Sequence, residues 1–232
     1  MFSILKTIFL ELVEFILPRF CLLCDTKGDD ICDECVQTKL RFSQEHKCHV
    51  CHKRLSGHEY LHSNCRKYSK LDGVFIVVDY NDAAKKILYE IKFEYHYKYA
   101  DKVALLMKTK FNQLALDIDF VIPVPLHRSK KWLRGFNQAE LISRKLPIPI
   151  KNIIVRVSNT RTQVGLDQQT RKSNLISAFE LNKKIDLSEK NLLLVDDITT
   201  SGATLEECAK LLKDSGASNV YALVWAHELD FL

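Results

Sequence analysis

The stretch Asn191-Leu-Leu-Leu-Val-Asp-Asp-Ile-Thr-Thr-Ser-Gly-Ala-Thr204 decides how the rest of this chain is interpreted. Its four apolar residues, Leu192 to Val195, predict a buried strand of a parallel sheet. Two carboxylates lie at the carboxyl end of that strand, where ligands of open α/β sheets bind. A hydroxyl-rich loop from Thr199 to Thr204 then leads into a predicted helix, whose free N–H groups suit a phosphate.

Two further features indicate the ligand of this stretch. The carboxylates of Asp196 and Asp197 can accept hydrogen bonds from two neighbouring hydroxyls, and Gly202 lets the backbone approach a ligand closely. A phosphate on one side and a vicinal diol on the other describe a ribose 5-phosphate. The alternative is an ordinary strand–turn–helix unit, but two adjacent acids at a buried strand end are costly without partners.

The run resembles the phosphoribosyl-diphosphate (PRPP) signature of the type I phosphoribosyltransferases. The apolar run, both acids and the Thr-Thr-Ser-Gly-x-Thr loop match. The resemblance implies that Asp196 and Asp197 are the catalytic carboxylates and hold the ribose hydroxyls. It also implies that the loop holds the 5′-phosphate through Thr199, Thr200, Ser201, Gly202, Ala203 and Thr204.

Length and composition indicate a globular protein. The chain has 232 residues, 47% of them hydrophobic and 27% charged, which allows one larger domain with a core and a smaller module. The formal net charge of +5 is unevenly placed. Between Leu126 and Asn174, eleven Lys or Arg residues face only two acids, a local charge of +9. This field indicates an anionic ligand, but it does not choose between a diphosphate and a nucleic acid.

Seven of the eight cysteines lie before residue 66, in pairs that indicate metal binding rather than a disulfide framework. The first predicted zinc site consists of Cys21, Cys24, Cys32 and Cys35. The second consists of Cys48, Cys51, His62 and Cys65. The alternatives are a cross-braced pairing of the four knuckles and three competing ligands, His49, His52 and His58. Because each site has four protein ligands, we expect both zinc ions to be structural.

The N-terminal segment, Met1 to Leu17, is apolar but is interrupted by Lys6, Glu11 and Glu14. It is too short and too charged to span a bilayer, and it lacks the features of a signal peptide. The pattern therefore predicts a helix that packs on a neighbour, and no transmembrane segment. A membrane-surface role is the alternative, although the polar face lacks the usual excess of Lys and Arg.

The rest of the chain predicts an α/β fold with a mostly parallel sheet flanked by helices. We expect a helix and zinc-knuckle domain over residues 1–70 and a phosphoribosyltransferase domain over residues 71–232. Apolar patterns predict strands at 74–80, 119–125, 153–157, 178–181, 192–195 and 219–225. They predict helices at 82–93, 103–111 and 203–214 and one that ends at residue 145. The strand at 178–181 is expected to return to the main sheet.

A second anion site is predicted where the strand at 119–125 runs into a basic loop. Arg128 and Arg134 can clamp a diphosphate through forked hydrogen bonds. A loop at this place binds pyrophosphate in type I phosphoribosyltransferases, and this one resembles it. The resemblance implies a diphosphate loop that includes Leu126, His127, Arg128 and Arg134. Trp132 on this loop indicates either a ligand or partner, or packing beneath the loop.

Two other segments suggest contacts with ligands. The polar segment 158–174 resembles the hood that closes over the diphosphate in this fold, with Arg161, Gln163 and Arg171 as hood residues. The segment from Lys92 to Tyr99 interleaves aromatic residues with lysines. It can stack bases of single-stranded DNA, or it can pack between two helices.

The order of these motifs is similar to that of the ComF family, proteins linked to natural transformation in bacteria. The resemblance rests on the zinc knuckles, Pro-Val-Pro-Leu-His-Arg, Arg-Gly-Phe-Asn-Gln and Val-Asp-Asp-Ile-Thr-Thr-Ser-Gly, and it runs from Cys21 to Trp225. It departs at His62, where the family usually has a cysteine. It implies a cytoplasmic protein that acts behind the DNA-uptake machinery, at the inner face of the membrane through partners. A helicase-like DNA translocase is the implied partner.

Two functions stay open at this point. The first is a PRPP-binding protein, with magnesium, that handles single-stranded DNA during natural transformation, and we favour it. The second is a free-standing phosphoribosyltransferase of nucleotide metabolism, which would displace pyrophosphate from PRPP. Trp225, His227 and Glu228 could face an acceptor base, but no motif identifies one, so the sequence leaves open whether the chain is an enzyme.

Overall fold

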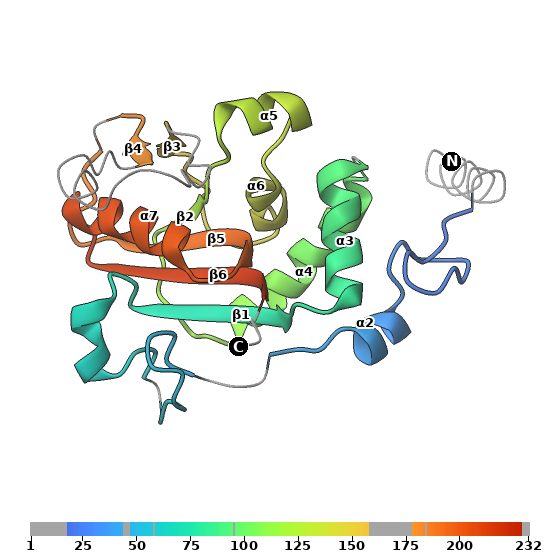
Figure 1. The fold of residues 1–232 in the computed structure, drawn as a ribbon, viewed down its shortest axis with the longest axis horizontal. Helices are drawn as coiled ribbons and strands as arrows, with labels where there is room; N and C mark the ends of the chain where they lie inside the picture. The colour runs from blue at the N-terminus through green and yellow to red at the C-terminus, as the bar shows by residue number, and fades with distance from the viewer. Residues whose placement is uncertain are drawn as a thin grey trace, which may run out of the picture.

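The computed structural model describes residues 18–43, 47–57, 59–94, 96–157, 178–183 and 185–228 (Figure 1). The predicted N-terminal helix, His58 and the hood residues Arg161, Gln163 and Arg171 lie outside the described residues. Within the described ranges, no helix is both long enough and apolar enough to cross a membrane.

A four-stranded parallel sheet in the order β1-β6-β5-β2 forms the centre of the fold. Its strands are β1 (Gly73–Asp79), β2 (Phe120–Pro123), β5 (Asn191–Thr199) and β6 (Asn219–His227). The two central strands are buried on both faces, which explains their almost continuous apolar sequences. Because all pairs are parallel, the carboxyl ends of the strands meet along one edge, where Thr199 lies opposite His227.

Helices cover both faces of this sheet (Figure 1). On one face pack α3 (Asp82–Phe93), α4 (Lys98–Asn112) and α6 (Gln138–Ser143). On the other face pack α7 (Ala203–Asp214) and a small sheet of β3 (Ile154–Arg156) and β4 (Phe179–Leu181). Two cores result: the first lies between the sheet and α3, α4 and α6, and the second between the sheet and α7, β3 and β4. Side chains alternate along β5, so that Leu193 and Val195 enter the first core while Leu192 and Leu194 enter the second.

The prediction that residues 178–181 return to the main sheet is wrong. β4 pairs only with β3, in an antiparallel two-stranded sheet. The outer edge of β2 is already occupied, because Val121 donates its N–H to Pro149 O and accepts from Lys151 N–H, at 2.9 and 2.8 Å. β4 therefore packs on the α7 face, where Ala178 N–H donates to Glu207.

Two short modules precede the sheet and lie near opposite ends of β1 (Figure 1). The first ribbon contains α2 (Asp33–Lys39) and contributes Ile31, Val36 and Leu40 to the first core. The second ribbon ends in the 3-10 helix η1 (Ser63–Tyr68) and has a small core of its own. Residues 41–43, after the first ribbon, run along the outer edge of β1, where Ser43 N–H donates to Val77 O at 3.0 Å.

Candidate functional site

The carboxyl end of β5 brings the paired acids and the hydroxyl-rich loop together. β5 extends to Thr199 because its pairing with β6 continues that far, so both acids lie inside the strand. α7 begins at Ala203, so the predicted six-residue loop is reduced to Thr200, Ser201 and Gly202. The acids and the loop therefore occupy the strand-end position that the sequence predicts.

The two carboxylates have different surroundings. Asp197 is 3% exposed, forms an ion pair with Lys92 at the end of α3, and accepts a hydrogen bond from Gln138 Nε2 at 3.5 Å. Asp196 is half-buried and accepts the N–H of Asp197 at 2.8 Å. Burial, and then the neighbouring carboxylate of Asp197, raise the pKa of Asp196 well above its usual range. Asp197 is thus held by Lys92 and Gln138, whereas among the described residues no cation forms an ion pair with Asp196.

Sequence reasoning missed Lys92 and Gln138 as members of this site. Lys92 lies in the aromatic–lysine segment, which suggested DNA contacts, and Gln138 ends the Arg-Gly-Phe-Asn-Gln motif without an assigned role. Both reach Asp197 from elements far away in the sequence. A buried acid requires a hydrogen-bonding or charged partner. That requirement was the only sign in the sequence that further residues belong to this site.

The loop after β5 is shaped for close approach of an anion. Gly202 has φ 74°, the left-handed conformation that favours glycine, and it caps α7. Thr200 and Ser201 are exposed, and the free N–H groups of the first turn of α7 follow them. His227 Nε2 lies 3.2 Å from Thr200 O, so the end of β6 supports the loop.

The predicted diphosphate loop is largely helical. His127 caps α5 (Arg128–Arg134), and Gly135 in the left-handed conformation ends it. A chain of hydrogen bonds joins this segment to the acids, because Arg134 donates to Gln138 Oε1 at 3.2 Å and Gln138 donates to Asp197. Arg128 is exposed on the first turn of α5. The structure thus brings Arg134 to the strand-end site and places Arg128 at the surface.

The acceptor prediction for Trp225 is wrong. Trp225 is 0% exposed and packs in the core beneath α3 and α4, because alternate residues of β6 face opposite sides of the sheet. His227 is half-buried at the end of the same strand, and Glu228 follows it, with its N–H donating to Thr199 O at 3.0 Å. Those two residues lie at the strand-end site.

Aromatic and basic side chains gather on α5 and the end of α3. Trp132 is 87% exposed, so the alternative in which it packs beneath the loop is wrong. Phe93 and Tyr97 are also exposed, with the Arg134 guanidinium 5.0 Å from the Phe93 ring centre. Tyr99, in contrast, is buried in the core, so the aromatic–lysine segment is only partly a surface feature. We call this set the aromatic–basic surface; it consists of the exposed residues Phe93, Tyr97, Lys130, Lys131 and Trp132 and of the half-buried Arg134.

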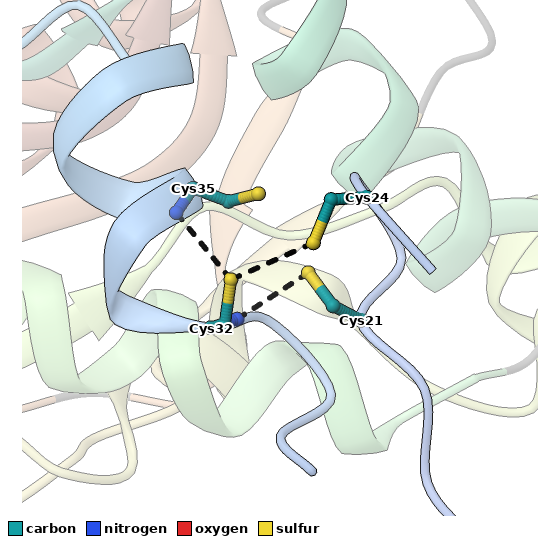
Figure 2. A group of neighbouring side chains, drawn as sticks. All are labelled: Cys21, Cys24, Cys32 and Cys35. Carbon is teal, nitrogen blue, oxygen red and sulfur yellow. Dashed lines mark hydrogen bonds between the residues drawn. The ribbon is translucent and has the colours of Figure 1, made fainter. Parts of the chain in front are cut away.

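Four cysteine side chains of the first ribbon face one another (Figure 2). The sulfur atoms of Cys24 and Cys32 are 3.7 Å apart, and backbone N–H groups point at the sulfurs of Cys21 and Cys32 at 3.4 Å. A tetrahedron with metal–sulfur bonds of about 2.3 Å has sulfur–sulfur edges of about 3.8 Å. Hydrogen bonds from Thr26 lower the pKa of Cys24 to about 6, which favours the thiolate that a metal requires. The geometry therefore fits a structural zinc ion.

The second ribbon gathers Cys48, Cys51, His62 and Cys65, with all ligand atoms within 4.8 Å of one another. Cys51 Sγ lies 3.3 Å from His62 Nδ1. The knuckles therefore pair in sequence order and are not cross-braced. Neither His49 nor His52 belongs to this cluster, and His49 Nε2 instead lies 2.8 Å from Ser69 Oγ. His62 takes the place that the family usually gives to a cysteine, and the donor set still fits zinc.

Comparisons with known proteins find two family matches in this chain. Residues 94–228 match the phosphoribosyl transferase domain, and residues 12–67 match the double zinc ribbon domain. The chain is 33% identical to competence protein F of Haemophilus influenzae, over 77% of this chain and 82% of that protein. It is 30% identical to DNA utilization protein YhgH of Escherichia coli K12, over 64% and 68%. It is 27% identical to competence protein ComFC of Bacillus subtilis, over 84% and 89%.

Proposed function

Because this chain belongs to the ComF family, we propose that it binds PRPP with magnesium and handles single-stranded DNA during natural transformation. The predicted fold class is confirmed: a phosphoribosyltransferase domain with a mostly parallel sheet follows an N-terminal zinc-binding domain. One observation carries the PRPP proposal. The half-buried carboxylate of Asp196 and the loop 200–202 lie together at the carboxyl edge of a parallel sheet.

The surroundings of the acids assign them different roles in holding PRPP. Lys92 neutralises Asp197, so Asp197 orients the strand end, and Asp196 accepts the hydrogen bonds of the ribose hydroxyls. The loop 200–202 and the first turn of α7 donate N–H groups to the 5′-phosphate. Magnesium prefers oxygen ligands, which Asp196 and PRPP supply, and it would neutralise the diphosphate charge. If the domain is catalytic, these groups stabilise the loss of pyrophosphate from the anomeric carbon.

The two ribbons each hold one structural zinc ion in this proposal. Both clusters have four protein ligands, which leaves no coordination position for a substrate. The first ribbon adds apolar side chains to the main core, and the second contacts α7. Zinc therefore supports the shape of the molecule rather than its chemistry.

The aromatic–basic surface is the proposed contact for single-stranded DNA. Exposed rings can stack bases, while lysine and arginine side chains neutralise phosphates. Relatives are named as competence and DNA utilization proteins, which agrees with a role in DNA uptake. The proposal includes a cytoplasmic location and a helicase-like DNA translocase as the partner that delivers the strand.

A titration tests the PRPP proposal. Zinc-loaded protein is titrated with PRPP and magnesium, and both heat and pyrophosphate release are followed, with and without single-stranded DNA. We expect binding in wild type and its loss in Asp196→Asn. Release of pyrophosphate only with DNA present would make the protein an enzyme of the uptake pathway. Release without DNA would instead favour a free-standing transferase, and absence of PRPP binding would refute the proposal.

A salt series tests the DNA contact. Each phosphate contact to a single strand contributes a slope of about −0.7 to the dependence of log affinity on log salt. A Lys130→Ala/Lys131→Ala variant should therefore lower the steepness by about 1.4, and Trp132→Ala should weaken binding at every salt concentration. A Lys53→Ala/Lys183→Ala variant is the matched control, because both lysines are exposed elsewhere. Equal slopes for the two double variants would exclude the aromatic–basic surface.

A further inference from the structure

A cavity of about 1000 Å³ lies between the second ribbon and the edge of the main sheet. Its walls come from the second ribbon, β1, the end of α4 and the loop after β5. We call it the ribbon cavity. Its lining includes Tyr60, Tyr68, Lys110, Thr200 and Ser201. Two carboxylates also line it, Asp79 and Glu206, and Glu206 is engaged by Ser69 and Lys70.

The ribbon cavity opens from the phosphate end of the proposed PRPP site. Its described lining includes the loop residues 199–202 but neither Asp196, Asp197 nor the segment 126–134. An acceptor that attacks the anomeric carbon would lie beside the ribose-binding acids and the diphosphate segment. The ribbon cavity therefore lies on the far side of the 5′-phosphate from the ribose. A ligand group that fills it would be attached to the ribose through that phosphate.

The positions of Thr200, Lys110 and Tyr60 along the cavity are given by the part of β1 to which each is connected. Thr200 lies at the carboxyl end, because its carbonyl is 3.2 Å from His227, which pairs with Asp79. Lys110 lies further along, since it donates to Ser43 O at 3.3 Å and Ser43 is bonded to Val77. Tyr60 lies at the start of the strand, in close contact with Gly73. The cavity is therefore elongated along β1.

The walls combine an unneutralised cation with exposed aromatic surface. Lys110 is half-buried, and among the described residues no carboxylate pairs with it. Burial lowers the pKa of Lys110, because it disfavours the charged ammonium group. An anion bound beside that group would offset this cost. The Tyr68 ring is 70% exposed, with the Lys67 ammonium 4.8 Å from its centre. An exposed ring beside cations is the arrangement that stacks a base and neutralises its phosphate.

We propose that the ribbon cavity binds a nucleoside phosphate joined to the ribose through the phosphate on the loop 200–202. The base stacks on Tyr68, and the phosphate of the added nucleoside pairs with Lys110. Both a free nucleoside diphosphate sugar, such as ADP-ribose, and a single-stranded nucleic acid present this chemistry. The inference rests on the proposed PRPP site, because it extends a ligand that is held there.

Calorimetry with three probes tests the inference: ribose 5-phosphate, ADP-ribose and a thymidine tetranucleotide. The full zinc-loaded chain should bind at least one of the two extended probes about tenfold more tightly than ribose 5-phosphate. Tyr68→Ala and Lys110→Met should each remove most of that gain and leave the affinity for ribose 5-phosphate within about twofold. Tyr89→Ala and Lys108→Met are matched controls, because neither residue lines the cavity. Zinc content verifies that each variant is folded.

The outcomes separate the possible sources of the ligand. A Tyr68-dependent gain for ADP-ribose alone assigns the cavity to nucleoside diphosphate sugars, and a gain for the tetranucleotide alone assigns it to a nucleic-acid strand. Equal effects of Tyr68→Ala and Tyr89→Ala would overturn the inference. If wild type binds PRPP and ribose 5-phosphate but gains nothing from either extension, only this inference fails. If it binds neither, the proposed function fails first.

Discussion

Glu206 connects the second ribbon to α7, the helix that follows the loop 200–202. It lies in the first turn of α7, and its carboxylate accepts hydrogen bonds from the Ser69 hydroxyl and from Lys70 N–H, the latter at 2.9 Å. His49 Nε2 lies 3.8 Å from the same carboxylate. The Glu206 side chain is only 33% exposed, so water screens these contacts incompletely. We predict that Glu206→Ala loosens the contact between the second ribbon and α7.

The size of the effect follows from the bonds that are lost. Hydrogen bonds to a charged group contribute roughly 1.5–3 kcal/mol each. The Ser69 hydroxyl can donate instead to Leu71 O, which is already 3.2 Å away, so only the Lys70 bond is lost without replacement. We therefore expect a loss of about 2 kcal/mol, which makes local opening about 30-fold more frequent.

Hydrogen–deuterium exchange at the Lys70 amide measures this opening. Protection of that amide should fall about 30-fold in Glu206→Ala, while amides of β5 and β6 keep theirs. Glu180→Ala is the matched control, because it removes an exposed carboxylate from β4. Unchanged protection at Lys70 would show that the carboxylate does not hold the ribbon, and the reasoning would be refuted.

Three further predictions concern the acids and the metal sites. Asp196→Asn should raise the Tm by roughly 2–4 °C while abolishing PRPP binding, because it removes a carboxylate whose ionisation is unfavourable beside Asp197. Calorimetric unfolding measures the Tm, and a lower Tm would contradict this prediction. Cys24→Ser and Cys51→Ser should each reduce the zinc content from two ions to one, as measured by mass spectrometry; loss of both ions from either variant would show that the sites are not independent. Asn191 N–H and then Lys190 lower the pKa of Asp119 below its usual 3.8, so the stabilisation is present above that value and is lost as the pH falls through the lower folded-state pKa. Urea unfolding below pH 4 should therefore show a steeper loss for wild type than for Asp119→Asn, and parallel curves would exclude this linkage.

Local patterns in the sequence determined two of the helices and the candidate metal ligands, but they did not predict α5. The predicted helices at 82–93 and 203–214 agree with α3 and α7 at both ends. Asn81 caps the first through its side chain, and Gly202 starts the second in a left-handed conformation. Zinc knuckles are equally local, because two ligands three residues apart already face one point. Such features depend on dihedral preferences and short spacings, which a sequence displays directly.

Tertiary structure decided which distant residues share a site. Lys92 and Gln138 reach Asp197 only because α3 and α6 pack on the same face of the sheet, next to β5. The same packing hides Trp225 and leaves Trp132 at the surface. An apolar pattern shows that a residue belongs to a strand or helix, but not which element covers it.

The sequence by itself therefore determined the strand-end acids, the loop that follows them and the candidate zinc ligands. Only the tertiary structure decided the partner of Asp197, the place of β4 and the contact between the second ribbon and α7. The physical reason is the range of the interactions. Caps, knuckles and strand patterns are set within a few residues, whereas an ion pair or a free sheet edge depends on how segments far apart in the chain close against one another.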